Sequence, residues 1–70
     1  MDNTFGNKIK ELREERKLTQ SQLAKDLGIY QTQVSKIELG SIEPNLDLIR
    51  KFARYFNVTA DFLLGLEDYY

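Results

Sequence analysis

The chain has 70 residues, of which 41% are hydrophobic, with no cysteine, no histidine and a formal net charge of −1. This length allows one domain with a small core, and the lack of cysteine excludes disulfides and thiolate metal sites. No glycine-rich phosphate loop or metal-ligand spacing is present, so we expect no enzyme activity, cofactor, metal or small-molecule ligand. No long apolar run or signal-peptide pattern occurs, so we expect a cytoplasmic protein without membrane contact.

Apolar spacing and capping residues predict five helices and no strand. The first covers about residues 4–16, with apolar residues at helical spacing and Thr4 placed to cap it. The second begins after Thr19, which forms a capping box with Gln22. The fourth follows Asn45 as its cap and has a buried stripe of Leu48, Ile49, Phe52, Ala53 and Phe56. The fifth is capped by Thr59 and carries Phe62, Leu63 and Leu66.

The third helix, expected over about residues 31–38, has one apolar side and one polar side. Gly28 precedes it and suits a left-handed helix-ending position, where a Cβ would be strained. At about 100° per residue, Val34 and Ile37 set the buried direction. Five side chains face away from it, and all but Leu39 suit a DNA groove: Gln31, Thr32, Ser35 and Lys36. From spacing alone, these four are equally compatible with an ordinary solvated helix face.

Residues 20–39, QSQLAKDLGIYQTQVSKIEL, resemble the helix-turn-helix of the Cro/cI-type (XRE) repressors of phages and bacteria. Inside this segment the matching residues are Gln20, Leu23, Ala24, Leu27, Gly28, Ile29, Val34, Ile37 and Glu38. Outside it they are Arg13, Leu18, Thr19, Gly40, Pro44 and the run 58–64. The resemblance covers about residues 5–65. It implies an all-α, five-helix, lambda-repressor-like fold in a single domain, 1–70, with residues 66–70 as a tail.

The resemblance also implies a function and roles for individual residues. The chain is expected to be a repressor-type transcriptional regulator that places its third helix in the major groove of double-stranded DNA. Base edges would be read by Gln31, Thr32, Ser35 and Lys36, and Gln31 can form two hydrogen bonds to adenine. Phosphates would be contacted by Gln20 and Tyr30, and the Gln20 side chain is also placed to brace Gln31. Arg13 and Glu38 are expected to form a structural ion pair between the first and third helices.

Three departures from the family pattern weaken the expected DNA affinity. Tyr30 stands where the family often has Ser or Thr as the cap of the third helix. The loop after that helix carries Glu43 rather than basic residues, and the helix itself has a single cation, Lys36. Residues 43–70 contain three basic and five acidic side chains, so the acidity is concentrated away from the expected DNA surface.

We therefore expect two copies to bind a pseudo-palindromic operator as a homodimer. With Phe62 and Leu64 assigned to the core, the fifth helix and tail supply the expected dimer interface: Ala60, Leu63, Leu66, Tyr69 and Tyr70. The alternative is that the tail lies on the fourth helix. Two other functions stay open, a protein-interaction module of the same fold, which the acidic charge favours, and an antitoxin that represses its own operon.

Overall fold

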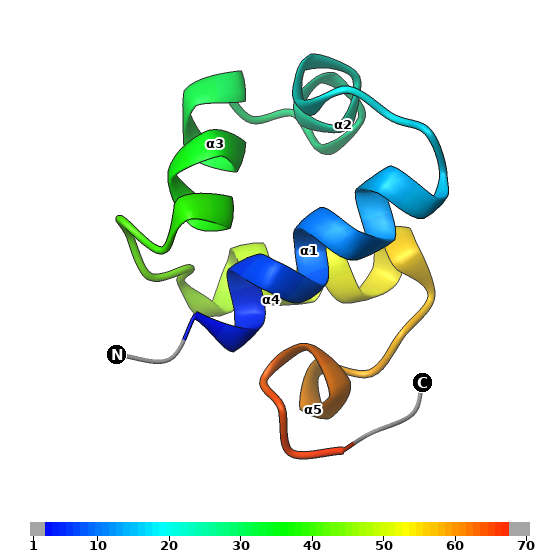
Figure 1. Cartoon of the computed structure of the whole chain (residues 1–70), viewed down its shortest axis with the longest axis vertical. Coiled ribbons are helices and arrows are strands. Elements are labelled where there is room, and N and C mark those ends of the chain that lie inside the picture. The colour runs from blue at the N-terminus through cyan, green and yellow to red at the C-terminus, as the bar shows by residue number, and fades with distance from the viewer. Residues whose placement is uncertain (1–2, 68–70) are drawn as a thin grey trace.

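The computed structural model describes residues 3–67, and within that range it contains five helices and no strand. They are α1 (Thr4–Glu15), α2 (Gln20–Leu27), α3 (Gln31–Leu39), α4 (Leu46–Phe56) and α5 (Ala60–Leu63). Figure 1 shows α1 crossing the middle of the molecule in front of α4, with α2 and α5 at opposite ends. The predicted all-α architecture is confirmed.

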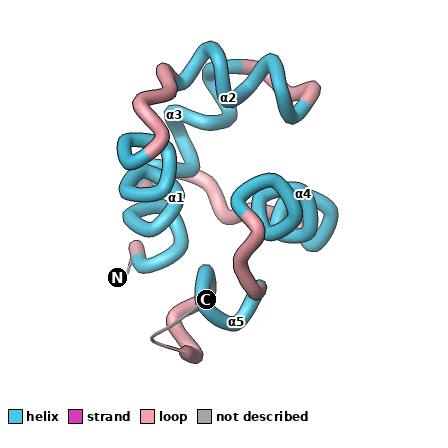
Figure 2. Tube along the Cα trace, turned by 90° about the vertical axis from the view of Figure 1, so that its right-hand side faces the viewer, coloured by secondary structure: helices cyan, strands magenta, loops and turns pink. Residues whose placement is uncertain are grey.

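All five helices contribute to one core. Its fully buried side chains are Ile9 from α1, Leu23 from α2, Val34 and Ile37 from α3, Phe52 from α4 and Leu63 from α5. Helices of four to twelve residues are not stable alone in water, so this shared burial is what holds them. In the side view of Figure 2, α5 lies below α1 and α4, and it packs against both of them. The rings of Phe5 in α1 and Phe52 in α4 are in contact, with 5.8 Å between their centroids.

Local capping sets most helix boundaries. The predicted capping box of α2 is present: the Thr19 hydroxyl accepts from the Gln22 N–H at 3.0 Å, and the Gln22 side chain accepts from the Thr19 N–H at 2.8 Å. Asn45 and Thr59 cap α4 and α5 as predicted, each with one side-chain bond: Asn45 accepts from the Leu48 N–H and Thr59 from the Phe62 N–H. The start of each of these three helices is therefore determined by residues only three positions apart in the sequence.

The predicted cap of α1 is wrong. Thr4 is the first residue inside the helix, and Asn3 occupies the N-cap position without a side-chain capping bond. The Asn3 amide instead donates to the main-chain carbonyl of Glu38 at 2.9 Å. That carbonyl lies in the last turn of α3, where no intrahelical partner remains. Asn3 therefore ties the start of α1 to the end of α3.

The predicted roles of Leu63 and Leu64 are reversed. Leu63 is fully buried, whereas Leu64 is 44% exposed. The inward face of α5 centres on Leu63 because this single-turn helix packs against α1 and α4 at once. Phe62 lies to the side of that face, with the Lys8 ammonium 4.2 Å from its ring centroid.

Candidate nucleic-acid interface

The turn between α2 and α3 has the geometry expected for Gly28. Its φ of 71° is in the left-handed region, and the following N–H, of Ile29, bonds to the Ala24 carbonyl at 3.0 Å. A side chain at Gly28 would meet no neighbour within 4 Å, so the backbone conformation alone favours glycine. This turn fixes the direction in which α3 leaves α2.

Tyr30 precedes α3 as its N-cap and makes no side-chain capping bond, as its chemistry predicts. A residue in the first turn of α3 supplies another bond at this helix end: the Gln33 side chain accepts a hydrogen bond from the Tyr30 N–H at 2.9 Å. The Tyr30 ring is 79% exposed. The departure from a Ser or Thr cap thus leaves an aromatic hydroxyl projecting beside the start of α3.

The two predicted sides of α3 are present. Val34, Ile37 and Glu38 are buried, while Gln31, Thr32 and Lys36 are exposed. Ser35 is only half-buried, so it is less accessible than the other three residues of the predicted base-reading set. The outer surface of α3 is therefore polar along its first two turns and ends at the exposed Leu39.

The predicted ion pair between Arg13 and Glu38 is present and bidentate. Arg13 Nε lies 2.7 Å from Glu38 Oε2, and Nη2 lies 3.0 Å from Oε1. The two side chains are 12% and 4% exposed, so the pair is largely shielded from water. The hydrogen bond to Glu38 raises the pKa of Arg13. Arg13 Nη1 also donates to the Leu18 carbonyl at 2.7 Å, which ties α1 to the chain entering α2 as well as to α3.

Two glutamines connect this ion pair to the outer face of α3. Gln20 Nε2 donates to Glu38 Oε1 at 3.1 Å, and Gln31 Nε2 donates to Gln20 Oε1 at 3.0 Å. The contact between Gln20 and Gln31 agrees with the predicted bracing. Sequence reasoning missed the bond from Gln20 to Glu38, because residues 18 positions apart on different helices share no local pattern.

The predicted dimer residues are not all on the surface. Leu63 is buried within the monomer and is not available to a partner, because α5 directs it into the core. Ala60 is half-buried and Leu66 is 73% exposed. Tyr69 and Tyr70 lie outside the described residues.

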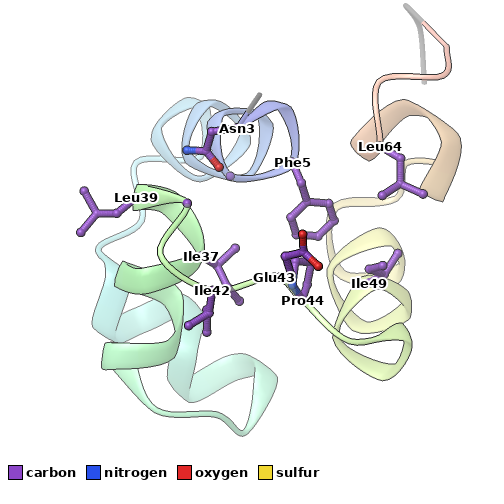
Figure 3. Close-up of a pocket in the computed structure, with 11 residues that line it drawn as sticks. Asn3, Phe5, Ile37, Leu39, Ile42, Glu43, Pro44, Ile49 and Leu64 are labelled. Carbon is purple, nitrogen blue, oxygen red and sulfur yellow. The ribbon is translucent and has the colours of Figure 1, made fainter. Parts of the chain in front are cut away.

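An open apolar cleft of about 340 Å³ lies beside α5, between the start of α1, the end of α3 and the loop before α4. Its apolar lining comes from several segments and includes Phe5, Ile37, Ile42, Pro44, Ile49 and Leu64 (Figure 3). The polar residues Asn3 and Glu43 also line it. Leu39 is at its edge and points away from it in Figure 3. The exposed Leu64 therefore belongs to a larger apolar surface.

Comparison with known proteins agrees with the geometry in identifying α2 and α3 as a helix-turn-helix. A family model described as helix-turn-helix matches residues 9–63. The chain belongs to the XRE-type helix-turn-helix family. The match covers the fully buried side chains of the core, from Ile9 to Leu63, and the whole segment from α2 to α3.

Curated relatives of this helix-turn-helix domain are named as transcriptional regulators. The HTH-type transcriptional activator BcrR of Enterococcus faecalis is 39% identical over 64 residues, which are 91% of this chain and 31% of BcrR. The uncharacterized HTH-type transcriptional regulator MJ0272 of Methanocaldococcus jannaschii is 39% identical over 62 residues, 89% of this chain and 94% of that protein. The phage CTXphi repressor RstR of Vibrio cholerae is 33% identical over 54 residues, covering 77% and 49%.

A solved structure has the same fold. Bacillus thuringiensis PlcR, crystallised with the peptide PapR7 and DNA, matches 97% of this chain with a TM-score of 0.81 and 29% identity, over 24% of its own length. The chain likewise spans only 31% of BcrR and 57% of the Bacillus subtilis regulator YobD.

Two further observations concern residues 3–67. No helix in this part of the chain is long and apolar enough to cross a membrane. The same residues contain no cluster of three or more acidic, histidine or cysteine side chains arranged to hold a metal ion.

Proposed function

We propose that this domain is a sequence-specific transcriptional regulator that binds double-stranded DNA by inserting α3 into the major groove. The observation that carries the proposal is the division of α3. Glu38 and two apolar residues anchor one side in the protein, and Gln31, Thr32 and Lys36 project from the other. A helix with this division presents hydrogen-bonding groups to base edges. The relatives named as transcriptional regulators support the same function.

The residues divide into two kinds of contact. Gln31, Thr32, Ser35 and Lys36 read bases or their flanks, with Gln31 set against adenine and Lys36 against guanine or a phosphate. Tyr30 and Gln20 hold phosphates. The nitrogen and the oxygen of the Gln20 side-chain amide are already hydrogen-bonded to Glu38 and Gln31. Its phosphate contact would therefore come from its main-chain N–H at the start of α2.

We propose that two copies bind as a homodimer through the apolar cleft and Leu64, rather than through Leu63. Apolar surface of this kind on a small domain is typical of an interaction site. The domain measures 28 × 24 × 21 Å, so two copies in contact can place their α3 helices in successive major grooves, about 34 Å apart. A two-fold pair would use the same surface on both copies.

The dimer is tested by sedimentation equilibrium of a Leu64→Asp variant. The variant should be monomeric at concentrations where the parent protein dimerises, because a carboxylate would be placed in the apolar contact. Leu46→Asp is the matched control, since Leu46 is exposed and does not line the cleft. Equal association by both variants, or a parent protein that stays monomeric at high concentration, would rule out this interface.

We further propose that binding represses transcription. Repression by occupying a promoter requires only DNA binding, whereas activation needs an additional contact with the transcription machinery. The relatives include both the activator BcrR and the repressor RstR. A reporter fused to the bound promoter separates the two, and increased expression in the presence of the protein would show activation.

The central experiment is titration of the protein into fragments of its own promoter region at two salt concentrations. Saturable, sequence-dependent binding that weakens with salt is expected. Gln31→Ala should weaken binding to the preferred fragment and leave thermal stability nearly unchanged, because its side-chain bond is exposed. Unchanged affinity of that variant would exclude Gln31 as a reader.

A protein-interaction module is the second candidate, and the charge favours it. The net charge is −1, and Lys36 is the only basic residue of α3, Gln31–Leu39. Phosphate neutralisation supplies much of the affinity of DNA-binding domains. Equally weak binding to every fragment in the same titration would therefore favour a protein partner over DNA.

A further inference from the structure

Two exposed pairs of like charge lie on the outer surfaces of α1 and α4. The acidic pair is Glu11 and Glu15 in α1, and the basic pair is Arg50 and Arg54 in α4. The members of each pair are four positions apart, so they are neighbours on the helix surface and repel each other. An opposite charge placed beside either pair would relieve that repulsion.

Neither pair has a charged partner among residues 3–67. The ion pair in this part of the chain joins Arg13 to Glu38, and the four side chains of the two pairs make no ion pair or hydrogen bond there. Other cations of the same two helices do have partners: Lys8 contacts an aromatic ring, and Lys51 donates to a main-chain carbonyl. The acidic and basic pairs are therefore available to another molecule.

The two pairs are on opposite sides of the domain. Figures 1 and 2 show α1 and α4 on either side of the core, and the rings of Phe5 and Phe52 meet between them. A second copy that covers the basic pair with its own acidic pair therefore leaves its own basic pair exposed for a third copy. Contacts of this head-to-tail kind do not close on themselves.

We propose that copies of this domain associate head to tail, with the acidic pair of one copy against the basic pair of the next. The chain's own acidic pair matches the basic pair in number, in spacing and in opposite sign. Each pair advances about 6 Å along its helix, so both ion pairs can form together. This contact is separate from the proposed dimer interface, because none of the four residues lines the cleft.

Exposed ion pairs contribute little in water, so the contact is weak between free molecules. It gains most where copies are already held side by side, as on adjacent DNA sites, and this part of the inference rests on the proposed function. Two exposed ion pairs correspond to a cooperativity factor of about 2- to 30-fold between neighbouring sites.

The first test is sedimentation velocity at high protein concentration and low salt. Wild type should form species larger than a dimer, and added salt should disperse them. Glu11→Arg/Glu15→Arg and Arg50→Glu/Arg54→Glu should each lose these species, because like charges then face each other. The variant with all four reversals has the net charge of wild type and exchanged pairs, so it should recover them.

A matched control separates this contact from a general effect of net charge. Lys17→Glu/Lys25→Glu changes the net charge as much as Arg50→Glu/Arg54→Glu does, at two exposed positions outside both pairs. This variant should keep the larger species. Its loss of them to the same extent as the α4 variant would show net-charge repulsion only and overturn the inference.

The second test is binding to DNA fragments that carry one or two adjacent copies of the preferred site. The ratio of the two affinities reports cooperativity whatever the affinity for a single site. Wild type and the four-reversal variant should be cooperative, and the two double variants should not be. The inference is overturned if wild type shows neither larger species nor cooperativity, or if the four-reversal variant recovers neither. Wild type that binds no DNA would refute the proposed function, and sedimentation alone would then decide the head-to-tail contact.

Discussion

Gly6 is the position where a small change should most directly disturb the placement of α3. A Cβ at this position would lie 2.2 Å from the main-chain carbonyl oxygen of Ile37 in α3. An ordinary C···O contact needs about 3.3 Å, so α1 and α3 would have to separate by about 1 Å. The obstacle is a backbone atom inside a packed helix, and it cannot turn aside as the end of a flexible side chain could.

Two effects of opposite sign compete in Gly6→Ala. In an exposed helix, alanine would add about 1 kcal/mol of stability over glycine. Overpacking of a core typically costs about 1–3 kcal/mol, and a rigid neighbour places this site at the upper end. We expect a net loss of about 2 kcal/mol. For a domain of this size that lowers the midpoint of thermal unfolding by roughly 8–16 °C.

Thermal and urea denaturation followed by far-ultraviolet circular dichroism measure this loss. Asn7→Ala is the matched control, because Asn7 is the next residue in α1, is exposed, and should gain a few tenths of a kcal/mol from helix propensity alone. A Gly6→Ala variant as stable as the parent, or more stable, would refute the close approach of the two helices.

Three further predictions follow from individual contacts. Arg13→Ala should cost about 3–5 kcal/mol in urea denaturation because it leaves the buried Glu38 carboxylate without its counter-charge, and a loss below about 1 kcal/mol would contradict that account. Lys36→Ala should reduce the slope of log binding constant against log salt by about 1, and an unchanged slope would exclude a phosphate contact. The hydrogen bond to Asp26 raises the pKa of Tyr55, so its contribution to stability is present below about pH 10 and lost as the phenol ionises; spectrophotometric titration should show this pKa lowered in Asp26→Asn.

The sequence predicts best what depends on neighbouring residues. Capping at Thr19, Asn45 and Thr59 acts within four residues, so these helix starts agree with the structure. The two sides of α3 follow from periodicity over nine residues, and the structure has the same division. Where a side chain and its partner lie within one or two helical turns of each other, the sequence pattern was sufficient to predict the local structure.

The two wrong predictions and the one missed contact have a common physical cause, which is packing between segments that are distant in the sequence. Asn3 rather than Thr4 precedes α1, and its side chain is engaged by a carbonyl in α3. Leu63 rather than Leu64 enters the core because a helix of one turn has too few residues to define its own apolar side, and the surfaces of α1 and α4 decide it. The bond from Gln20 to Glu38 likewise depends on how two helices cross.

The scarcity of positive charge on α3 and the hydrogen bond that holds the Gln31 side chain belong together in the proposed function. With one cation on α3, the sequence-independent attraction to DNA is small, and most of the affinity for a correct site must come from base contacts. Base contacts gain most when the reading side chain is already oriented, and in the protein the Gln31 amide is already hydrogen-bonded to Gln20. One half-site still offers few such contacts. A second copy held through the cleft would bring a second half-site to the same DNA at high effective concentration, so dimerisation would supply the affinity that charge does not.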